Sequence, residues 1–153
     1  MTKPIPDGFH TVTPYLTVRG AEKVIAFLKQ AFNAETPEEP LKQPDGKIMH
    51  AAVKIGDSIV MLADENEMMK AQPSWLYVYV PNVDSVFQQA IKAGGKPIME
   101  PTDMFYGDRS AAVTDPSGNS WTIATHKEDV ERQELKKRAE AFIKQQRQKH
   151  KAA

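Results

Sequence analysis

The sequence predicts an α+β protein made of two repeated β-α-β-β-β modules and one further helix. Segments that alternate polar and apolar residues, as strands do, flank two segments with helical period. A shift of 62 residues places strand on strand, helix on helix and glycine turn on glycine turn, with six identities that include Tyr15 with Tyr77 and Gly56 with Gly118. The chain of 153 residues is long enough for one domain with a hydrophobic core.

The first module is predicted over residues 9–65. Residues 13–18 alternate as a strand, and residues 21–33 form a helix that Asn33 can terminate. Prolines then exclude a helix until the turn at residues 44–46, after which residues 49–55 and 57–64 are predicted as strands. We expect the core face of these strands to carry Val12, Leu16, Val18, Met49, Ala51, Val53 and Ile55.

The second module is predicted over residues 74–126, after a polar linker. Residues 75–80 form its first strand, and residues 82–95 form a helix that Gly94 and Gly95 end. Strands follow at residues 96–101, 109–114 and 120–125. Asp115-Pro116-Ser117-Gly118 is a turn, because proline fixes φ at its second position and glycine accepts a positive φ.

The chain beyond residue 128 differs from both modules, so we expect a domain at residues 1–128 and a C-terminal helix at residues 129–150. Residues 127–153 contain no Gly or Pro and carry nine Lys and Arg against five Asp and Glu, with the acids first. This helix is expected to dock on the domain or on a partner subunit. A nucleic-acid-binding arm is the weaker interpretation, because such a basic run is usually a solvated helix end.

Composition favours a cytoplasmic protein with neither nucleic acid nor membrane as a partner. Twenty basic and twenty acidic side chains give no net charge, and cysteine is absent, which excludes disulfides and thiolate sites and fits a reducing compartment. The first residues contain no apolar segment typical of a secretory signal, and no apolar run approaches the length of a membrane helix.

Alternation also predicts a second sheet face that is polar and aromatic. Large aromatic side chains on a flat exposed sheet would form a costly apolar patch, whereas a curved mixed sheet around a pocket would shelter them. Aromatic rings with a few polar groups are typical of a small-molecule site. The alternative is a second core or a dimer interface. The residues expected on this face are Thr13, Tyr15, His50, Met61, Trp75, Tyr77, Tyr79 and Thr122.

One residue of this face and two outside it are candidates for chemistry or ligand contacts. His50 is the only histidine inside the predicted sheet, so it is the candidate acid-base catalyst; otherwise it is a hydrogen-bonded histidine on a half-buried strand. Arg109 could bind a carboxylate or phosphate, or it could fix its own loop together with Asp108. Phe105 is expected either to cover the pocket or to anchor a long loop.

Several segments in order resemble one family. "TVTPYLTV", "IMHAAVKIGDSIVMLADE" and "FYGDRSAAVTDPSGNSWTIATHKEDV" resemble the vicinal oxygen chelate superfamily, which includes glyoxalase I, extradiol dioxygenases and bleomycin resistance proteins, and within it the PhnB-like, glyoxalase-related branch. The resemblance spans about residues 9–130. It implies a homodimer and a site between paired modules, with the pairing either within one chain or across two.

The resemblance also implies where metal-using members carry their ligands, usually His and Glu. Those positions fall here on Thr13, Met61 (or Val60), Trp75 and Thr122. None is a credible ligand for a catalytic divalent ion, so we expect no metal and no other cofactor. The preferred hypothesis is a metal-independent protein that binds a small aromatic or amphipathic molecule. One alternative is a lyase, isomerase or other enzyme that uses His50, and another is an interaction protein whose aromatic face is an interface.

Overall fold

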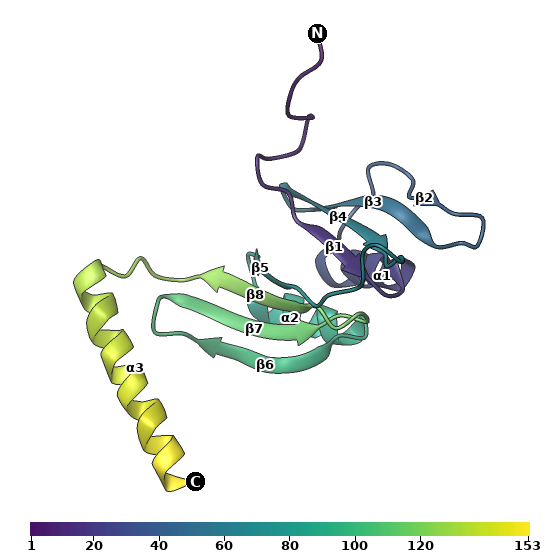
Figure 1. The fold of residues 1–153 in the computed structure, drawn as a ribbon. Helices are drawn as coiled ribbons and strands as arrows, with labels where there is room; N and C mark the ends of the chain where they lie inside the picture. Colours follow the sequence, from purple (N-terminus) through teal and green to yellow (C-terminus); the bar gives the residue numbers. More distant parts are fainter.

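The computed structural model describes residues 1–153 and contains two four-stranded mixed sheets with three helices (Figure 1), which confirms the predicted α+β fold. The elements are β1 (Tyr15–Val18), α1 (Ala21–Phe32), β2 (Leu41–Lys42), β3 (Ile48–Ile55), β4 (Ser58–Asp64), β5 (Trp75–Tyr79), α2 (Val83–Lys92), β6 (Lys96–Asp103), β7 (Asp108–Thr114), β8 (Ser120–His126) and α3 (Arg132–Ala152).

The two modules have the same topology. The strand order is β1-β4-β3-β2 in the first sheet and β5-β8-β7-β6 in the second. In each sheet the first strand pairs in parallel with the last strand of its module, and the remaining pairs are antiparallel. This parallel pairing places the helix of each module on one face of its own sheet and leaves the other face without a helix.

The two modules share one hydrophobic core, because their helices pack against each other. The Gln89 side-chain amide of α2 donates to the carbonyl oxygen of Gln30 and to Oδ1 of Asn33 at the end of α1, at 2.7 and 2.9 Å. The rings of Phe32 and Trp121 lie 5.5 Å apart and join α1 to the second sheet. A single cluster of 22 buried residues results, drawn from both modules.

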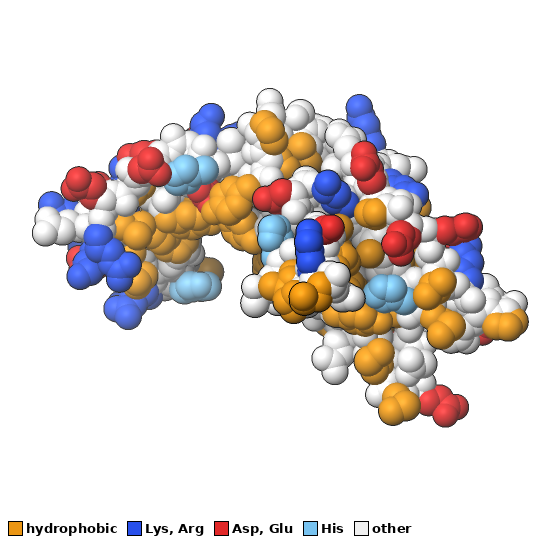
Figure 2. All heavy atoms as spheres, turned by 90° about the horizontal axis from the view of Figure 1, so that it is seen from above, with side chains coloured by type: hydrophobic (Ala, Val, Ile, Leu, Met, Phe, Trp, Pro, Cys, Tyr) orange, Lys and Arg blue, Asp and Glu red, His pale blue; other side chains and the backbone are white.

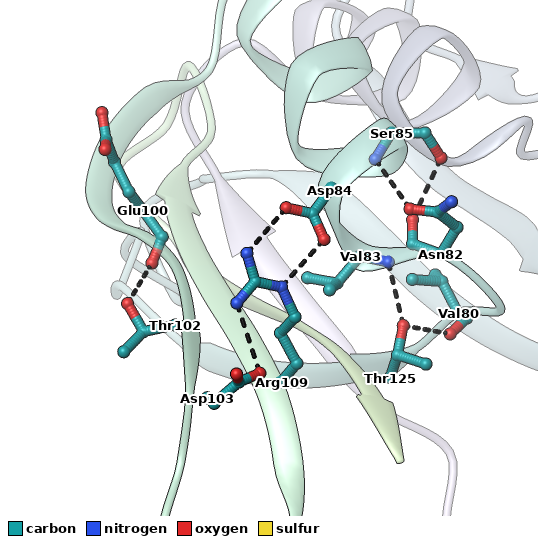
Figure 3. A network of polar contacts seen from close by, with 10 residues as sticks. All are labelled: Val80, Asn82, Val83, Asp84, Ser85, Glu100, Thr102, Asp103, Arg109 and Thr125. Atoms are coloured by element: carbon teal, nitrogen blue, oxygen red, sulfur yellow. Dashed lines mark hydrogen bonds and ion pairs between the residues drawn. The ribbon is translucent and has the colours of Figure 1, made fainter. Parts of the chain in front are cut away.

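At the start of α1 and of α2, backbone N–H groups donate to a side chain from the last strand of the same module. Oδ1 of Asp64 accepts the backbone N–H groups of Gly20 and Ala21 at 3.0 and 2.9 Å, at the start of α1. Oγ1 of Thr125 accepts the backbone N–H of Val83 at 2.9 Å, at the start of α2 (Figure 3). These bonds satisfy amides that would otherwise lack a partner at a helix N-terminus.

Three details of the first module differ from the sequence-based prediction. Met49 was expected in the core but is 56% exposed, because a bulge in β3 places one extra residue between the positions that pair with Leu41 and Lys42. Val12 precedes β1 and is exposed, so it does not lie under α1. The short strand β2 was not predicted at all, because two residues carry no alternation to detect.

The C-terminal helix α3 extends away from the sheets and touches the domain near its first turns (Figure 1). The guanidinium of Arg138 donates to both carboxylate oxygens of Glu128 and to the carbonyl oxygen of Phe105. The rings of Phe105 and Phe142 lie 5.0 Å apart. No residue of α3 is buried. None of the three helices combines the length and apolar character that crossing a bilayer requires.

The turn before β8 is organised by one buried carboxylate, that of Asp115. It accepts the backbone N–H groups of Ser117 and Asn119, the side-chain amide of Asn119 and the indole N–H of Trp121, all at 2.8–3.0 Å. Trp121 is completely buried in the shared core. The turn motif therefore fixes both the start of β8 and the largest side chain of the core.

Replacing Asp115 with alanine is expected to lower the free energy of unfolding by about 3 kcal/mol, because buried donors, including the Trp121 indole N–H, would lose their acceptor. Urea denaturation followed by circular dichroism measures this change. Asp45→Ala serves as the control. The Asp45 carboxylate is exposed and accepts one backbone N–H, from Lys47, so its loss should cost less than about 1 kcal/mol. Equal effects of the two substitutions would contradict this role of Asp115.

Candidate ligand-binding face

The second sheet presents an aromatic surface on the side that α2 does not cover. Trp75 and Tyr79 of β5 point to this side and are 67% and 63% exposed. Strands β8 and β7, which follow β5 in the sheet, contribute small and polar side chains, several of which are buried. We call this surface the aromatic face and define it by Trp75, Tyr77, Tyr79, Asp108, Ser110, Thr122, Ala124 and His126.

Hydrogen bonds hold the three rings of β5 in place. The indole N–H of Trp75 donates to Oγ1 of Thr122 at 2.7 Å. The hydroxyl groups of Tyr77 and Tyr79 both donate to Oδ2 of Asp108, at 2.8 and 2.9 Å. Because β8 lies between β5 and β7, the tyrosine side chains reach across β8. Ala124 of β8, which is fully buried, has no side chain large enough to obstruct them.

The carboxylate of Asp108 also binds a histidine. Oδ1 of Asp108 lies 2.8 Å from Nδ1 of His126, its register partner on β8, and Asp108 is only 5% exposed. Nε2 of His126 lies 2.7 Å from a carboxylate oxygen of Asp129, whose side chain is fully exposed. Carboxylate oxygens accept hydrogen bonds and do not donate them, so both imidazole nitrogens must carry protons in this arrangement.

The ionisation of these groups follows from their contacts. Burial alone would raise the pKa of the Asp108 carboxyl, but the hydrogen bonds from His126, Tyr77 and Tyr79 outweigh it and hold this pKa below its ordinary value. The contact with Asp108, and after it the contact with Asp129, raises the pKa of His126. Tyr79 has a raised pKa because its hydroxyl donates to Asp108. An ionised carboxylate, a protonated imidazole and neutral phenols therefore make up the polar end of the face.

The predicted residues of the first module lie on a separate face. The rings of Tyr15 and His50 are stacked with their centroids 6.1 Å apart. Met61 is the register partner of Tyr15, and so shares its face, whereas Val60 is buried in the core. Thr13 lies in the segment before β1, and its hydroxyl donates to the carbonyl oxygen of His10 at 3.1 Å.

The chain does not bring these two faces together. No strand of the first sheet pairs with a strand of the second, and the modules meet instead through α1 and α2, on the opposite sides of the sheets. The predicted set therefore divides into two groups. Thr13, Tyr15, His50 and Met61 belong to the first module, and Trp75, Tyr77, Tyr79 and Thr122 belong to the second.

Arg109 and Phe105 lie apart from the aromatic rings of β5. The guanidinium of Arg109 donates twice to Asp84 at 2.9 Å and once to Asp103 at 3.2 Å, on the side of α2 (Figure 3). All three contacts are with protein carboxylates. Phe105 packs on Tyr106 and on Phe142 of α3. Figure 2, in which α3 lies on the left as in Figure 1, shows hydrophobic side chains gathered in a hollow beside this helix.

Asp108 and His126 are the residues that sequence reasoning missed. The sequence-based prediction placed Asp108 in the loop of Arg109, and it left His126 outside the last strand, which was predicted to end at residue 125. Strand alternation contained the signal, because His126 is four residues after Thr122 and must share its face. What alternation could not provide was the register between β7 and β8, which sets His126 opposite Asp108.

The residues at the metal positions of the resemblance do not fit a divalent cation. Trp75 and Thr122 are hydrogen-bonded to each other, the Thr13 hydroxyl is engaged with a backbone carbonyl, and Met61 offers only a thioether. No group of three His, Cys, Asp or Glu side chains in the structure is arranged to hold an ion. We therefore assign no metal-dependent step to these residues.

A cavity of about 680 Å³ lies between the two modules, on the core side of β5, and is lined mainly by apolar residues such as Phe32, Val78 and Trp121. Several polar side chains along its wall are engaged with other protein groups: His10 contacts the Asp57 carbonyl oxygen, and Oδ1 of Asn33 accepts from Gln89. Ser58 donates to Asp57, and the two tyrosine hydroxyls donate to Asp108. The cavity is thus mainly apolar, and we place the candidate site on the aromatic face, where exposed rings and a hydrogen-bonded polar cluster lie together.

Comparison with protein-family models matches residues 8–123 to the family described as Glyoxalase/Bleomycin resistance protein/Dioxygenase superfamily. Among curated proteins, the uncharacterized protein Rv0887c of Mycobacterium tuberculosis is 32% identical over 136 residues, which covers 81% of this chain and 79% of that protein. An uncharacterized protein of Mycobacterium bovis, Mb0911c, is equally similar and is covered over 88% of its length.

Solved structures share the fold at lower identity. TioX from Micromonospora sp. ML1 superposes with a TM-score of 0.63 and 24% identity, covering 76% of this chain and 98% of that one. A PhnB protein from Bacillus cereus, described as a putative 3-demethylubiquinone-9 3-methyltransferase, has a TM-score of 0.61 and 21% identity, covering 76% and 99%. At these identities the likeness concerns the fold alone.

The pKa of His126 is expected to lie above 6.5, and Asp108→Asn should lower it, because the contact that raises it most would be lost. Proton NMR titration of the imidazole signals, with His126→Gln for assignment, measures both values. A raised folded-state pKa also means that the stabilisation from His126 is complete below pH 6.5 and is lost as the pH rises through that pKa. An unchanged titration midpoint in Asp108→Asn would contradict the assignment.

Proposed function

The chain belongs to the Glyoxalase/Bleomycin resistance protein/Dioxygenase superfamily, and from this membership we propose that it binds a small aromatic or amphipathic molecule on its aromatic face, without a metal ion. The exposure of Trp75 and Tyr79 is the observation that carries the proposal. Large rings held in fixed positions by hydrogen bonds, yet open on one side, form a ready surface for a second ring to stack on.

One buried polar atom on the same face supports the proposal. The hydroxyl of Ser110 is buried and has no hydrogen-bond partner in the protein. Ser110 pairs in register with Ala124 on β8, and Ala124 is in turn the register partner of Tyr79. Buried hydroxyl groups without a partner are uncommon in proteins. A ligand or a water molecule at this point would supply the hydrogen bond that the Ser110 hydroxyl lacks.

We propose binding rather than catalysis by His50. The His50 imidazole stacks on Tyr15 but makes no side-chain hydrogen bond, so no neighbouring group orients it or fixes its tautomer for proton transfer. A lyase or isomerase activity centred on His50 would need such a partner from the substrate itself. The absence of cysteine supports placing this function in the cytoplasm.

A homodimer is part of the proposal, because both sheet faces without helices expose aromatic side chains. Tyr15 of the first module is 44% exposed and Trp75 of the second is 67% exposed, on sheets whose other faces are covered by α1 and α2. A second copy could place its first module over the aromatic face and so close a pocket from two half-sites. That arrangement would unite Tyr15, His50 and Met61 of one copy with Trp75 and Tyr79 of the other.

Binding is tested with the neutral probe 1-naphthalenemethanol in isothermal titration calorimetry. Trp75→Ala and Tyr79→Ala are each expected to weaken binding about tenfold, because one stacking partner is worth roughly 1 kcal/mol or more. Met68→Ala, which removes an exposed side chain of the linker, should leave the affinity unchanged. Equal affinity of all four proteins would remove the aromatic face as the site.

The dimer is tested by sedimentation equilibrium. We expect the mass of two 17.1 kDa chains at micromolar concentration, and a shift toward the monomer in Tyr79→Glu, since a carboxylate would be desolvated in the interface. Lys70→Glu, which alters charge in the linker, is the matched control and should remain dimeric. A monomeric mass for the unmodified protein would contradict the homodimer and leave the binding proposal to the calorimetric test.

A further inference from the structure

His126 and Asp129 form a polar contact whose purpose is not explained by the fold. Both residues lie beyond residue 123, where the match to the family model ends. Asp129 sits in the segment between β8 and α3, and its side chain is fully exposed. The contact therefore ties a solvent-exposed carboxylate to the polar end of the aromatic face, at the Nε2 atom of His126.

The geometry around His126 defines what Nε2 can bind. Nδ1 is bonded to Oδ1 of Asp108, a buried carboxylate that two tyrosine hydroxyls hold in place through Oδ2, so turning the ring would break a bond to a fixed acceptor. The two nitrogens lie on different edges of the imidazole. Nε2 therefore presents its proton away from Asp108, at a point where a carboxylate oxygen already lies at 2.7 Å.

We propose that the aromatic face takes an aromatic carboxylate, and that the carboxylate of this ligand replaces Asp129 at Nε2 of His126. The inference rests on the proposed function and specifies its ligand class. Asp129 occupies the position that the ligand group would take, and because its side chain lies in solvent, leaving His126 returns it to water at little cost. The exchange preserves the local charge, since one carboxylate substitutes for another.

The spacing of the face fits a ring with a directly attached carboxylate. Tyr79 is the register partner of Ala124, two residues before His126 on β8. A strand rises about 3.3 Å per residue, so the Cα atoms of residues 124 and 126 lie about 7 Å apart. A ring stacked over Tyr79 thus brings a substituent on its edge to the imidazole. The rings of Tyr77 and Tyr79, with centroids 5.1 Å apart, provide the adjoining apolar surface.

The charged state of His126 sets the pH dependence of this site. The titratable groups that face His126 are Asp108 from β7, Asp129 from the segment after β8 and, through Asp108, the two tyrosines of β5. His126 is the group expected to change its charge near neutral pH, because hydrogen bonds hold the pKa of Asp108 below its ordinary value and both tyrosines have raised pKa values. Binding of an aromatic carboxylate should therefore weaken as the pH rises through the pKa of His126.

The test compares two probes with the same ring system, 1-naphthoate and 1-naphthalenemethanol, by calorimetry at pH 6 and pH 9. At pH 6 the carboxylate should bind about tenfold more tightly than the alcohol, and this ratio should be smaller at pH 9, because a larger fraction of His126 is then neutral. In His126→Gln the ratio should be close to one at both values of pH. In Asp129→Asn, which removes the competing carboxylate, naphthoate should bind severalfold more tightly while the alcohol is unaffected.

Glu131→Gln is the matched control, because Glu131 lies in the same segment and makes no side-chain cap bond to α3. It should change the affinity of neither probe. Equal binding of both probes at pH 6, with no effect of Asp129→Asn, overturns the inference and leaves the proposed function standing. Binding of neither probe overturns both. Asp129 is exposed, so Asp129→Asn remains informative even if His126→Gln fails to fold.

Discussion

The aromatic face depends on one buried carboxylate, that of Asp108. Its two oxygens accept three side chains from two strands, and the phenols of Tyr77 and Tyr79 would otherwise be held only by their chain positions. A carboxylate in an apolar sheet is costly unless hydrogen bonds satisfy it, and here every donor comes from a residue of the same face. The carboxylate and the rings therefore stabilise one another.

The packing of α1 on α2 is the second constraint, and it acts at a larger scale. Because α1 and α2 pack against each other at the centre of the molecule, the sheet surfaces that they leave uncovered point away from the shared core. A single chain thus carries two half-sites, each with its own aromatic residues. This geometry explains why residues with the same role in the repeat, such as Tyr15 and Tyr77, do not meet within one chain.

Strand alternation and helical period were enough to predict the α+β fold and both modules, and they assigned the aromatic residues of β5 to the open face. They placed Trp75, Tyr77 and Thr122 on one side correctly because β5 and β8 are regular over their full length. They placed Met49 incorrectly because a bulge changes the period without leaving a mark in the residue types. The Asp108–His126 pair depends on the register of two strands, which is a property of the folded sheet. Arg109 was ambiguous in the sequence because its partner Asp84 lies on a helix 25 residues away.

The anchoring of the two helices follows one rule in both modules. Ala21 and Val83 each donate a backbone amide to a side chain in the last strand of their own module, Asp64 in the first copy and Thr125 in the second. These two acceptors are structurally equivalent, because each lies three residues after the register partner of the equivalent tyrosine, Tyr15 or Tyr77. A carboxylate in one copy and a hydroxyl in the other therefore perform the same task, so the position tolerates a change of chemical group as long as an acceptor oxygen remains.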